Sequence, residues 1–97
     1  MRLIEKVKEN NYKIYKVVEL EKEIGAVEII EEKDHIFIEN IFLQLEFRGQ
    51  GFLRKILQKF SEKPIKCLPL QQHRKKFEHL GFQICEILGE DIYYLKA

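Results

Sequence analysis

The sequence predicts an α+β fold in which a mixed, mostly antiparallel sheet of six to seven strands packs with two helices. Three observations support this prediction. Apolar and polar residues alternate in short runs through the first half of the chain, which is typical of strands with one face on a core. After Gln50 the apolar spacing becomes that of an amphipathic helix. The 97 residues, 45% of them hydrophobic, suit one domain, so residues 1–97 are expected to share one core.

Four strands joined by polar turns are expected in the first half of the chain. The first turn lies at residues 9–11, and the next two lie at 21–23 and 32–34. Consecutive short strands with tight turns form an antiparallel meander. In the second strand one face carries Tyr12, Ile14, Val18 and Leu20. The predicted strands are residues 2–8, 12–20, 24–31 and 36–45.

Helices and strands alternate in the second half. Residues 52–60 form the first predicted helix, because their apolar side chains fall on one side, and Pro64 prevents its continuation. A short strand follows at 65–68. A second helix runs from Gln71 to Leu80, with His73 and Phe77 on one side, before two strands at 84–88 and 91–95. A strand, helix, strand crossover sets its strands parallel, so the sheet should be mixed.

Charge is distributed unevenly, although the net charge is only +1. Residues 1–46 contain 7 basic and 11 acidic side chains, whereas residues 47–97 contain 10 and 5. The near-neutral total argues against a dedicated nucleic-acid-binding protein. An anionic partner is therefore expected on the second half.

Cysteine use and hydropathy predict the compartment. The chain has two cysteines, no signal peptide and no apolar segment of about 20 residues, which favours a cytoplasmic protein without membrane contact. Cys67 and Cys85 are expected to be small buried apolar residues. The histidines and cysteines show no ligand spacing, so no metal is expected.

Residues 46–55, Glu-Phe-Arg-Gly-Gln-Gly-Phe-Leu-Arg-Lys, lie where an apolar strand ends and the first helix begins. Gly49 and Gly51 can adopt backbone angles closed to other residues and let a ligand approach the main chain. The unpaired N–H groups of a first helical turn favour negative charge, and Arg48, Arg54 and Lys55 add cations. The segment therefore predicts a phosphate or pyrophosphate cradle at residues 48–53. The simpler interpretation is that the glycines only turn the chain from strand to helix.

Three segments resemble the GNAT superfamily of N-acetyltransferases. The stretch from Ile38 to Gly51 is similar to the family's fourth strand and its Arg/Gln-x-x-Gly-x-Gly/Ala loop. Residues 77–82, Phe-Glu-His-Leu-Gly-Phe, resemble the Tyr-Glu-Lys-Leu-Gly-Phe segment that ends the family's last helix. Gly25 lies where the family usually has a glycine in its second strand. The resemblance covers residues 12–97 in the same order and implies a three-layer αβα arrangement.

The resemblance also implies a reaction, which is direct acetyl transfer from acetyl-CoA, as co-substrate, to an amine. Main-chain groups of Phe42 and Leu43 are implied to hold the pantetheine arm where the fourth and fifth strands separate. The loop amides are implied to hold the pyrophosphate. The cofactor-binding residues expected on this basis are Phe42, Leu43, Arg48, Gly49, Gln50, Gly51, Phe52, Leu53 and Arg54.

The sequence departs from the family's pattern at several positions. Leu53 replaces the last small residue of the loop, and its side chain is expected in the apolar stripe of the helix. Phe77 stands where a tyrosine often protonates the leaving thiolate, and Leu70 stands where an asparagine often contacts the cofactor. Neither side chain can supply that polar group. Leu45 replaces the proline that often ends the fourth strand.

Two residues are candidates for catalysis. Glu39, expected on the same strand face as Ile41 and Leu43, is a candidate to remove the amine proton, directly or through water. An ordinary exposed carboxylate is an equally good interpretation of it. His73 is a candidate base or polar partner near the thiol, or else a half-buried helix residue. The basic run 74–76 is expected on the solvated face of its helix, or beside the cofactor phosphates.

The family normally places two helices between its first and second strands, whereas this chain has only the turn at residues 9–11. Those helices usually enclose the acceptor pocket, so an open acceptor side is implied, suited to a protein, a peptide or a site completed by an oligomer. The main hypothesis is a minimal acetyltransferase acting on an amine of a small molecule, peptide or protein. The alternatives are a non-catalytic GNAT-fold module that binds CoA or a protein partner, and a nucleic-acid adaptor using residues 54–76. A homodimer is compatible with the sequence.

Overall fold

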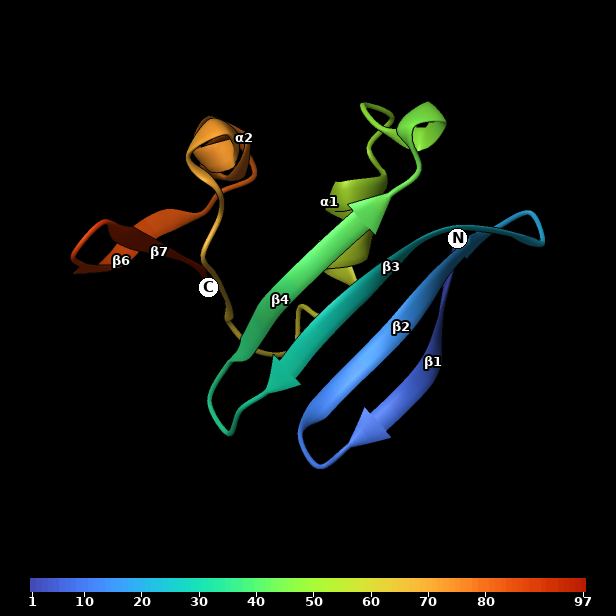
Figure 1. Ribbon diagram of the computed structural model, residues 1–97, viewed down its shortest axis with the longest axis horizontal. Coiled ribbons are helices and arrows are strands. Elements are labelled where there is room, and N and C mark those ends of the chain that lie inside the picture. Colours follow the sequence, from blue (N-terminus) through green and yellow to red (C-terminus); the bar gives the residue numbers. More distant parts are fainter.

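The computed structural model describes residues 1–97 and is built on one seven-stranded sheet with two α-helices (Figure 1). The strand order is β1-β2-β3-β4-β5-β7-β6. Neighbouring strands are antiparallel except for β4 and β5, which are parallel. The predicted mixed α+β fold is therefore confirmed. The elements are β1 (Arg2–Glu9), β2 (Tyr12–Glu19), β3 (Lys22–Glu31), β4 (Ile36–Leu43), α1 (Phe52–Gln58), β5 (Ile65–Cys67), α2 (Arg74–His79), β6 (Gln83–Leu88) and β7 (Asp91–Lys96).

Tight turns connect the first three strands. Asn10 has a left-handed φ of 55° in the β1–β2 turn, which asparagine tolerates better than most residues. In the β2–β3 turn, Leu20 and Glu21 have φ values of 49° and 65°. Glu19 pairs with Lys22 across this turn, so the chain reverses earlier than the expected turn at 21–23. Leu20 is 92% exposed and does not lie on the strand face where the alternation placed it.

The parallel strands β4 and β5 contact each other over a short length only. They pair at three positions, the last of which joins Ile38 to Cys67. The chain then leaves the sheet toward Pro69, which cannot donate to a ladder, while β4 continues to Leu43. The two strands therefore separate beyond Ile38, as the resemblance implied.

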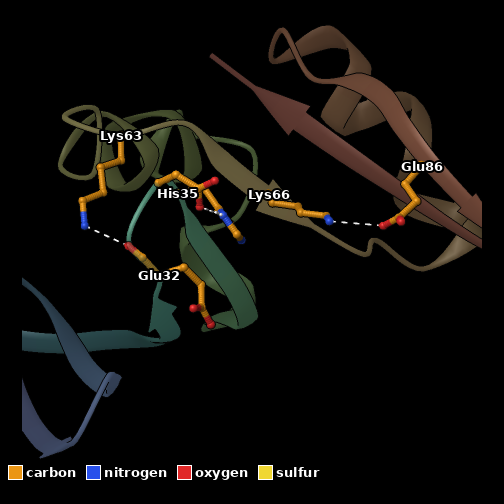
Figure 2. Close-up of polar contacts among 6 residues, drawn as sticks. Glu32, His35, Lys63, Lys66 and Glu86 are labelled. Atoms are coloured by element: carbon orange, nitrogen blue, oxygen red, sulfur yellow. Dashed lines mark hydrogen bonds and ion pairs between the residues drawn. The ribbon is translucent and has the colours of Figure 1, made fainter.

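Hydrogen bonds fasten the segments that lead into β4 and β5. The Ile36 N–H donates to the Pro64 carbonyl at 2.9 Å. Figure 2 shows the Lys63 ammonium directed at the Glu32 carbonyl, to which it donates at 2.9 Å. β4 and β5 are therefore hydrogen-bonded to each other where they begin but not where they end, and the gap between them opens toward their C-terminal ends.

A hydrophobic core lies between the sheet and α1, which passes behind β3 and β4 in Figure 1. Phe52, Ile56 and Leu57 of α1 are buried, and Phe60 just after the helix is buried with them, as the predicted stripe requires. They belong to one cluster with Val17, Ile24, Val27, Ile29, Ile36, Ile38, Ile65, Cys67, Phe82 and Tyr94.

The second helix lies on the same face of the sheet as α1. It is formed in two parts, a 3₁₀ turn at Gln71–His73 and then α2, where one helix from 71 to 80 was expected. Phe77 and Leu80 pack against the core, and the ring of Phe77 meets that of Phe82 edge-on at 5.3 Å. Both helices line one cleft together with Ile41, which places α2 beside α1 over the sheet.

The opposite face of the sheet, called the open face below, carries no helix. β1 and β2 are joined directly by residues 10–11, so no helical segment is available between them. The three-layer αβα arrangement is therefore corrected to two layers. Neither helix has the length and apolar character needed to cross a bilayer. The open face is formed by side chains that alternate with the buried ones, including Ile14, Ala26, Glu28, Phe37, Asn40, Phe42, Lys66 and Tyr93.

Candidate functional site

The unpaired edge of β4 forms one wall of the candidate site. Past the last pair with β5, this edge has no neighbouring strand along residues 39–43. On the other edge, the Gln44 N–H donates to the Ile24 carbonyl at 2.8 Å. Hydrogen-bonding directions alternate along a strand, so the main-chain groups of Ile41 and Leu43 point to the unpaired edge. The Leu43 carbonyl accordingly accepts a hydrogen bond from Arg48 Nε at 2.8 Å.

The loop after β4 contains the two glycines that the sequence singled out. Gly49 and Gly51 have φ values of 74° and 83°, which are left-handed values that glycine adopts without strain. A Cβ built on either glycine meets open space. Side chains brace the loop at two points, since Arg48 bonds to the end of β4 and Gln50 Nε2 donates to the Glu46 carbonyl at 2.6 Å. The loop is thus held in shape while its glycines stay accessible.

The main-chain N–H groups of residues 49–54 form the third part of the site. None of these consecutive amides has an acceptor within the protein. Gly51 caps α1 in a left-handed conformation and provides no side-chain hydrogen bond of its own. Successive unpaired amides at a turn into a helix form a concave site for anionic oxygens. An anion can approach these groups through the open space beside the glycines.

A cleft of about 550 Å³ joins the β4 edge, the loop and α2. Part of its lining is apolar and consists of Ile41, Leu43, Phe52, Leu53, Phe77 and Leu80. The polar part consists of Arg48, Arg54, His73, Lys76 and His79. No carboxylate lines the cleft, so its field favours an anionic ligand, and its apolar wall suits an uncharged portion of the same ligand.

Most of the residues expected at the cofactor site line this cleft. They are Leu43, Arg48, Gly49, Gly51, Phe52, Leu53 and Arg54. Leu53 also packs against the core, as expected from the apolar stripe of its helix. Gln50 turns its side chain back onto the loop and contributes its main-chain N–H to the run of free amides.

Phe42 is placed differently. Its ring lies on the open face, 51% exposed, with the Arg48 guanidinium carbon 5.8 Å from its centroid. Its carbonyl lies against Gly25 of β3, so that a Cβ on Gly25 would come within 2.1 Å of the carbonyl oxygen. Alternation along β4 therefore turns the main chain of Phe42 toward β3, and the groups available on the unpaired edge are those of Ile41 and Leu43.

The two candidate catalytic residues lie on different sides of the sheet. The pairing of β3 with β4 shifts register at Glu39, which has no partner and forms a β-bulge. Glu39 is therefore not on the face of Ile41 and Leu43, where it was expected. Glu39 lies close enough to Tyr12, a residue of the open face, for its negative charge to help raise the pKa of that tyrosine. The main cause of this raised pKa is the hydrogen bond that the Tyr12 hydroxyl donates to Glu28. His73 lines the cleft on the helical side.

Ile41, His79 and Leu80 also line the cleft, and the sequence did not single them out as site residues. Lys76 belongs to the basic run 74–76, which was expected either on the solvated face of its helix or beside the cofactor phosphates, and it lines the cleft as well. The signal that could have placed it is helical spacing, because residues 73, 76, 77 and 80 fall on one side of a helix. Arg74 also points inward, and its Nε atom is buried without a hydrogen-bond partner.

The two cysteines differ in environment. Cys67 is buried, and this burial raises the pKa of its thiol to about 12, which leaves almost no thiolate at neutral pH. Cys85 is exposed, contrary to expectation, because β6 is the edge strand of the sheet. No three His, Cys, Asp or Glu side chains come together in a metal-binding arrangement.

Comparison with solved structures identifies the fold. The chain is similar to a GNAT family acetyltransferase from Elizabethkingia anophelis with acetyl-CoA bound, at a TM-score of 0.69 and 15% identity, over 89% of this chain and 76% of that one. It is also similar to the Campylobacter jejuni N-acetyltransferase PseH in complex with acetyl coenzyme A, at a TM-score of 0.71 and 14% identity, over 90% and 68%. An acetyltransferase from Thermus thermophilus gives a TM-score of 0.76 at 12% identity, over 90% and 64%.

The similarity is one of structure. No family sequence profile and no curated protein matches the chain in sequence. The chain spans 64% of the Thermus protein and somewhat more of the other two. The chain therefore has the GNAT acetyltransferase fold, and β4, its loop and α1 are the parts of this fold that surround the cleft.

Proposed function

We propose that this protein transfers an acetyl group from acetyl-CoA to an amine. The observation that carries the proposal is the junction of the splayed β4 edge with the free amides of residues 49–54, within a GNAT fold. These amides match the oxygens of a pyrophosphate, and the guanidinium groups of Arg48 and Arg54 supply the neutralising charge. Lys76 of α2 adds a cation from the other wall of the cleft.

The uncharged arm of the co-substrate would lie along β4. The main-chain groups of Ile41 and Leu43 face the unpaired edge, where amides of an extended ligand can pair with them as a neighbouring strand would. Phe77 and Leu80 provide an apolar wall opposite this edge. The reacting end of the arm would then lie near the β4 bulge at Glu39, just past Ile38, where β4 no longer pairs with β5.

Acetyl transfer needs a free amine and a leaving thiolate. The amine nitrogen attacks the thioester carbonyl, a C–N bond forms, the C–S bond breaks, and the thiolate departs. Glu39 on the open face is the candidate to take the amine proton, directly or through water. Phe77 has no proton to give to the thiolate. A thiolate leaves readily without an acid, and loss of general-acid help costs about 10²–10⁴-fold in rate, so turnover should be slow rather than absent.

Binding of CoA, measured by isothermal titration calorimetry at low salt, tests the cradle. The Gly51→Ala variant puts a methyl group into the space beside the amides at a φ of 83°, and roughly tenfold weaker binding is expected. The Gly89→Ala variant is the matched control, since Gly89 also has a positive φ and open space for a Cβ, but lies in the β6–β7 turn. Absence of CoA binding to the unmodified protein, or equal affinity in both variants, would refute the assignment.

A second function is favoured by one observation, the phenylalanine at position 77. A GNAT-fold module without catalysis would bind CoA and a protein partner but release no thiol. Thiol release from acetyl-CoA in the presence of polyamines, aminoglycosides or lysine peptides separates the two functions. Release that depends on both the amine and the protein supports the transferase, whereas CoA binding without release with any amine supports the module.

A further inference from the structure

Four side chains from four strands gather on the open face beside the point where β4 and β5 separate. They are Phe37 of β4, Lys66 of β5, Tyr93 of β7 and Glu86 of β6. The Lys66 ammonium lies 5.0 Å from the centroid of the Tyr93 ring and 3.2 Å from Glu86 Oε1. The rings of Phe37 and Tyr93 are adjacent, with centroids 6.4 Å apart. Figure 2 shows Lys66 extended from β5 toward Glu86.

Tyr93 and Glu86 offer the two contacts that a primary ammonium group makes, and Phe37 lies beside the Tyr93 ring. These three side chains are called the ammonium box below. The face of an aromatic ring attracts a cation, and a carboxylate accepts hydrogen bonds from the N–H groups of an ammonium ion. Lys66 is the occupant supplied by the chain itself, and it makes both types of contact at once. The side chains of Lys66 and Glu86 are 26% and 45% exposed, so a ligand from solvent can reach the box.

The position of the ammonium box relates it to the cleft. Phe37 pairs with Lys66 one step before Ile38 pairs with Cys67, which is the last contact between β4 and β5. The box therefore borders the opening in the sheet, on the side without helices. The cleft on the helical side has a lining of arginine, lysine and histidine without carboxylates, which disfavours an ammonium ion. A cation at the box and an anion in the cleft would thus be separated by the sheet except at its opening.

We propose that the ammonium box is the acceptor subsite for a primary alkylammonium group, such as that of a lysine side chain, and that Lys66 occupies it as an internal competitor. This inference rests on the proposed acetyl transfer for the role of the subsite. The binding of the cation itself does not depend on turnover. Replacing Lys66 by methionine keeps an unbranched side chain on β5 and vacates the contacts with Tyr93 and Glu86.

The test uses Nα-acetyl-lysine amide as the probe and the ring-proton NMR signals of Phe37 and Tyr93 as the readout. In Lys66→Met the probe should shift both sets of signals and bind roughly two- to fivefold more tightly than to the unmodified protein. The double variant Lys66→Met, Glu86→Gln should lose this gain. Lys13→Met is the control, because Lys13 is also a strand lysine, paired with Glu31 at 3.4 Å and remote from the box. It should bind the probe as the unmodified protein does.

Several outcomes would overturn the inference. They are no shift of the Phe37 and Tyr93 signals in Lys66→Met, an equal gain in Lys13→Met, or equal binding of the uncharged analogue Nα,Nε-diacetyl-lysine amide. Circular dichroism of each variant establishes that it is folded. Acetylation of the probe at a KM unaffected by Lys66→Met would refute the subsite while leaving the proposed function intact. Probe binding at the box, without thiol release from acetyl-CoA in the presence of the probe or of any amine of the panel above, would refute the transferase while leaving the cation site intact.

Discussion

We expect Gly25 of β3 to tolerate substitution less than any other glycine of the fold, because the backbone of β4 leaves no space for a side chain there. A Cβ at this position would lie 2.1 Å from the Phe42 carbonyl oxygen and 3.1 Å from the Leu43 Cα. An unstrained contact between carbon and oxygen is about 3.3–3.6 Å, so β4 must retreat by more than about 1 Å. Overpacking of this kind lowers the free energy of unfolding by about 1–3 kcal/mol. Alanine also restricts the unfolded chain more than glycine does, which raises the free energy of unfolding by about 0.4–1 kcal/mol.

The net cost expected for Gly25→Ala is about 1–2 kcal/mol, which lowers the Tm of a domain of this size by roughly 5–15 °C. Thermal and urea unfolding followed by circular dichroism measure it. Gly89→Ala is the matched control, because Gly89 has a φ of 64° but open space for a Cβ. Its cost comes from backbone strain alone and should be about 1 kcal/mol or less.

The comparison of the two variants decides between crowding and strain. If Gly25→Ala changed the stability by less than about 0.5 kcal/mol, or less than Gly89→Ala does, the tight approach of β3 to β4 would be refuted. A second consequence concerns the site. Displacement of β4 at Leu43 moves the carbonyl that Arg48 holds at 2.8 Å, so Gly25→Ala should also weaken CoA binding, whereas Gly89→Ala should not.

Three further predictions concern the two cysteines, Tyr94 and Arg48. An iodoacetamide reaction at pH 8 should label Cys85 quickly and Cys67 only on unfolding, because burial raises the pKa of Cys67 to about 12; rapid labelling of both would contradict this. Burial, and then the hydrogen bond to Glu78, raise the pKa of Tyr94 above its ordinary 10.0, so the contribution of Tyr94 to stability should be fully present below pH 10 and be lost as the pH rises further. Tyr94→Phe should show a smaller fall in alkaline urea unfolding, and an identical profile would disprove the assignment. Arg48→Ala should weaken CoA binding roughly tenfold in calorimetry and reduce its dependence on salt, and unchanged salt dependence would remove Arg48 from the site.

The order of the elements could be predicted because each depends on local pattern. Short alternating runs separated by polar turns defined the first four strands, and the stripe from Phe52 to Phe60 defined α1. The positive φ values of Gly49 and Gly51 were predictable in the same way, since a chain that turns from strand to helix through two glycines uses the angles that only glycine adopts freely.

The face of Glu39 could not be predicted from alternation. A β-bulge adds one residue to a strand, and every later side chain then changes face relative to simple counting. Nothing in the local sequence of β4 marks the bulge, which depends on how β4 pairs with β3. The exposure of Cys85 likewise depends on strand order, because only the position of β6 at the sheet edge leaves it uncovered.

The two sides of the opening between β4 and β5 offer different charged groups, and this difference bears on the proposed acetyl transfer. The cleft on the helical side is lined by cations without a carboxylate, whereas the open face beside the opening carries Glu28, Glu39 at the β4 bulge, and Glu86, which pairs with Lys66. An ammonium ion is attracted to the open face, but it must lose a proton before its nitrogen can attack a carbonyl carbon. A carboxylate at the β4 bulge can accept that proton where the field of the cleft already disfavours the cation. Deprotonation and attack are therefore expected at the same place, the opening itself.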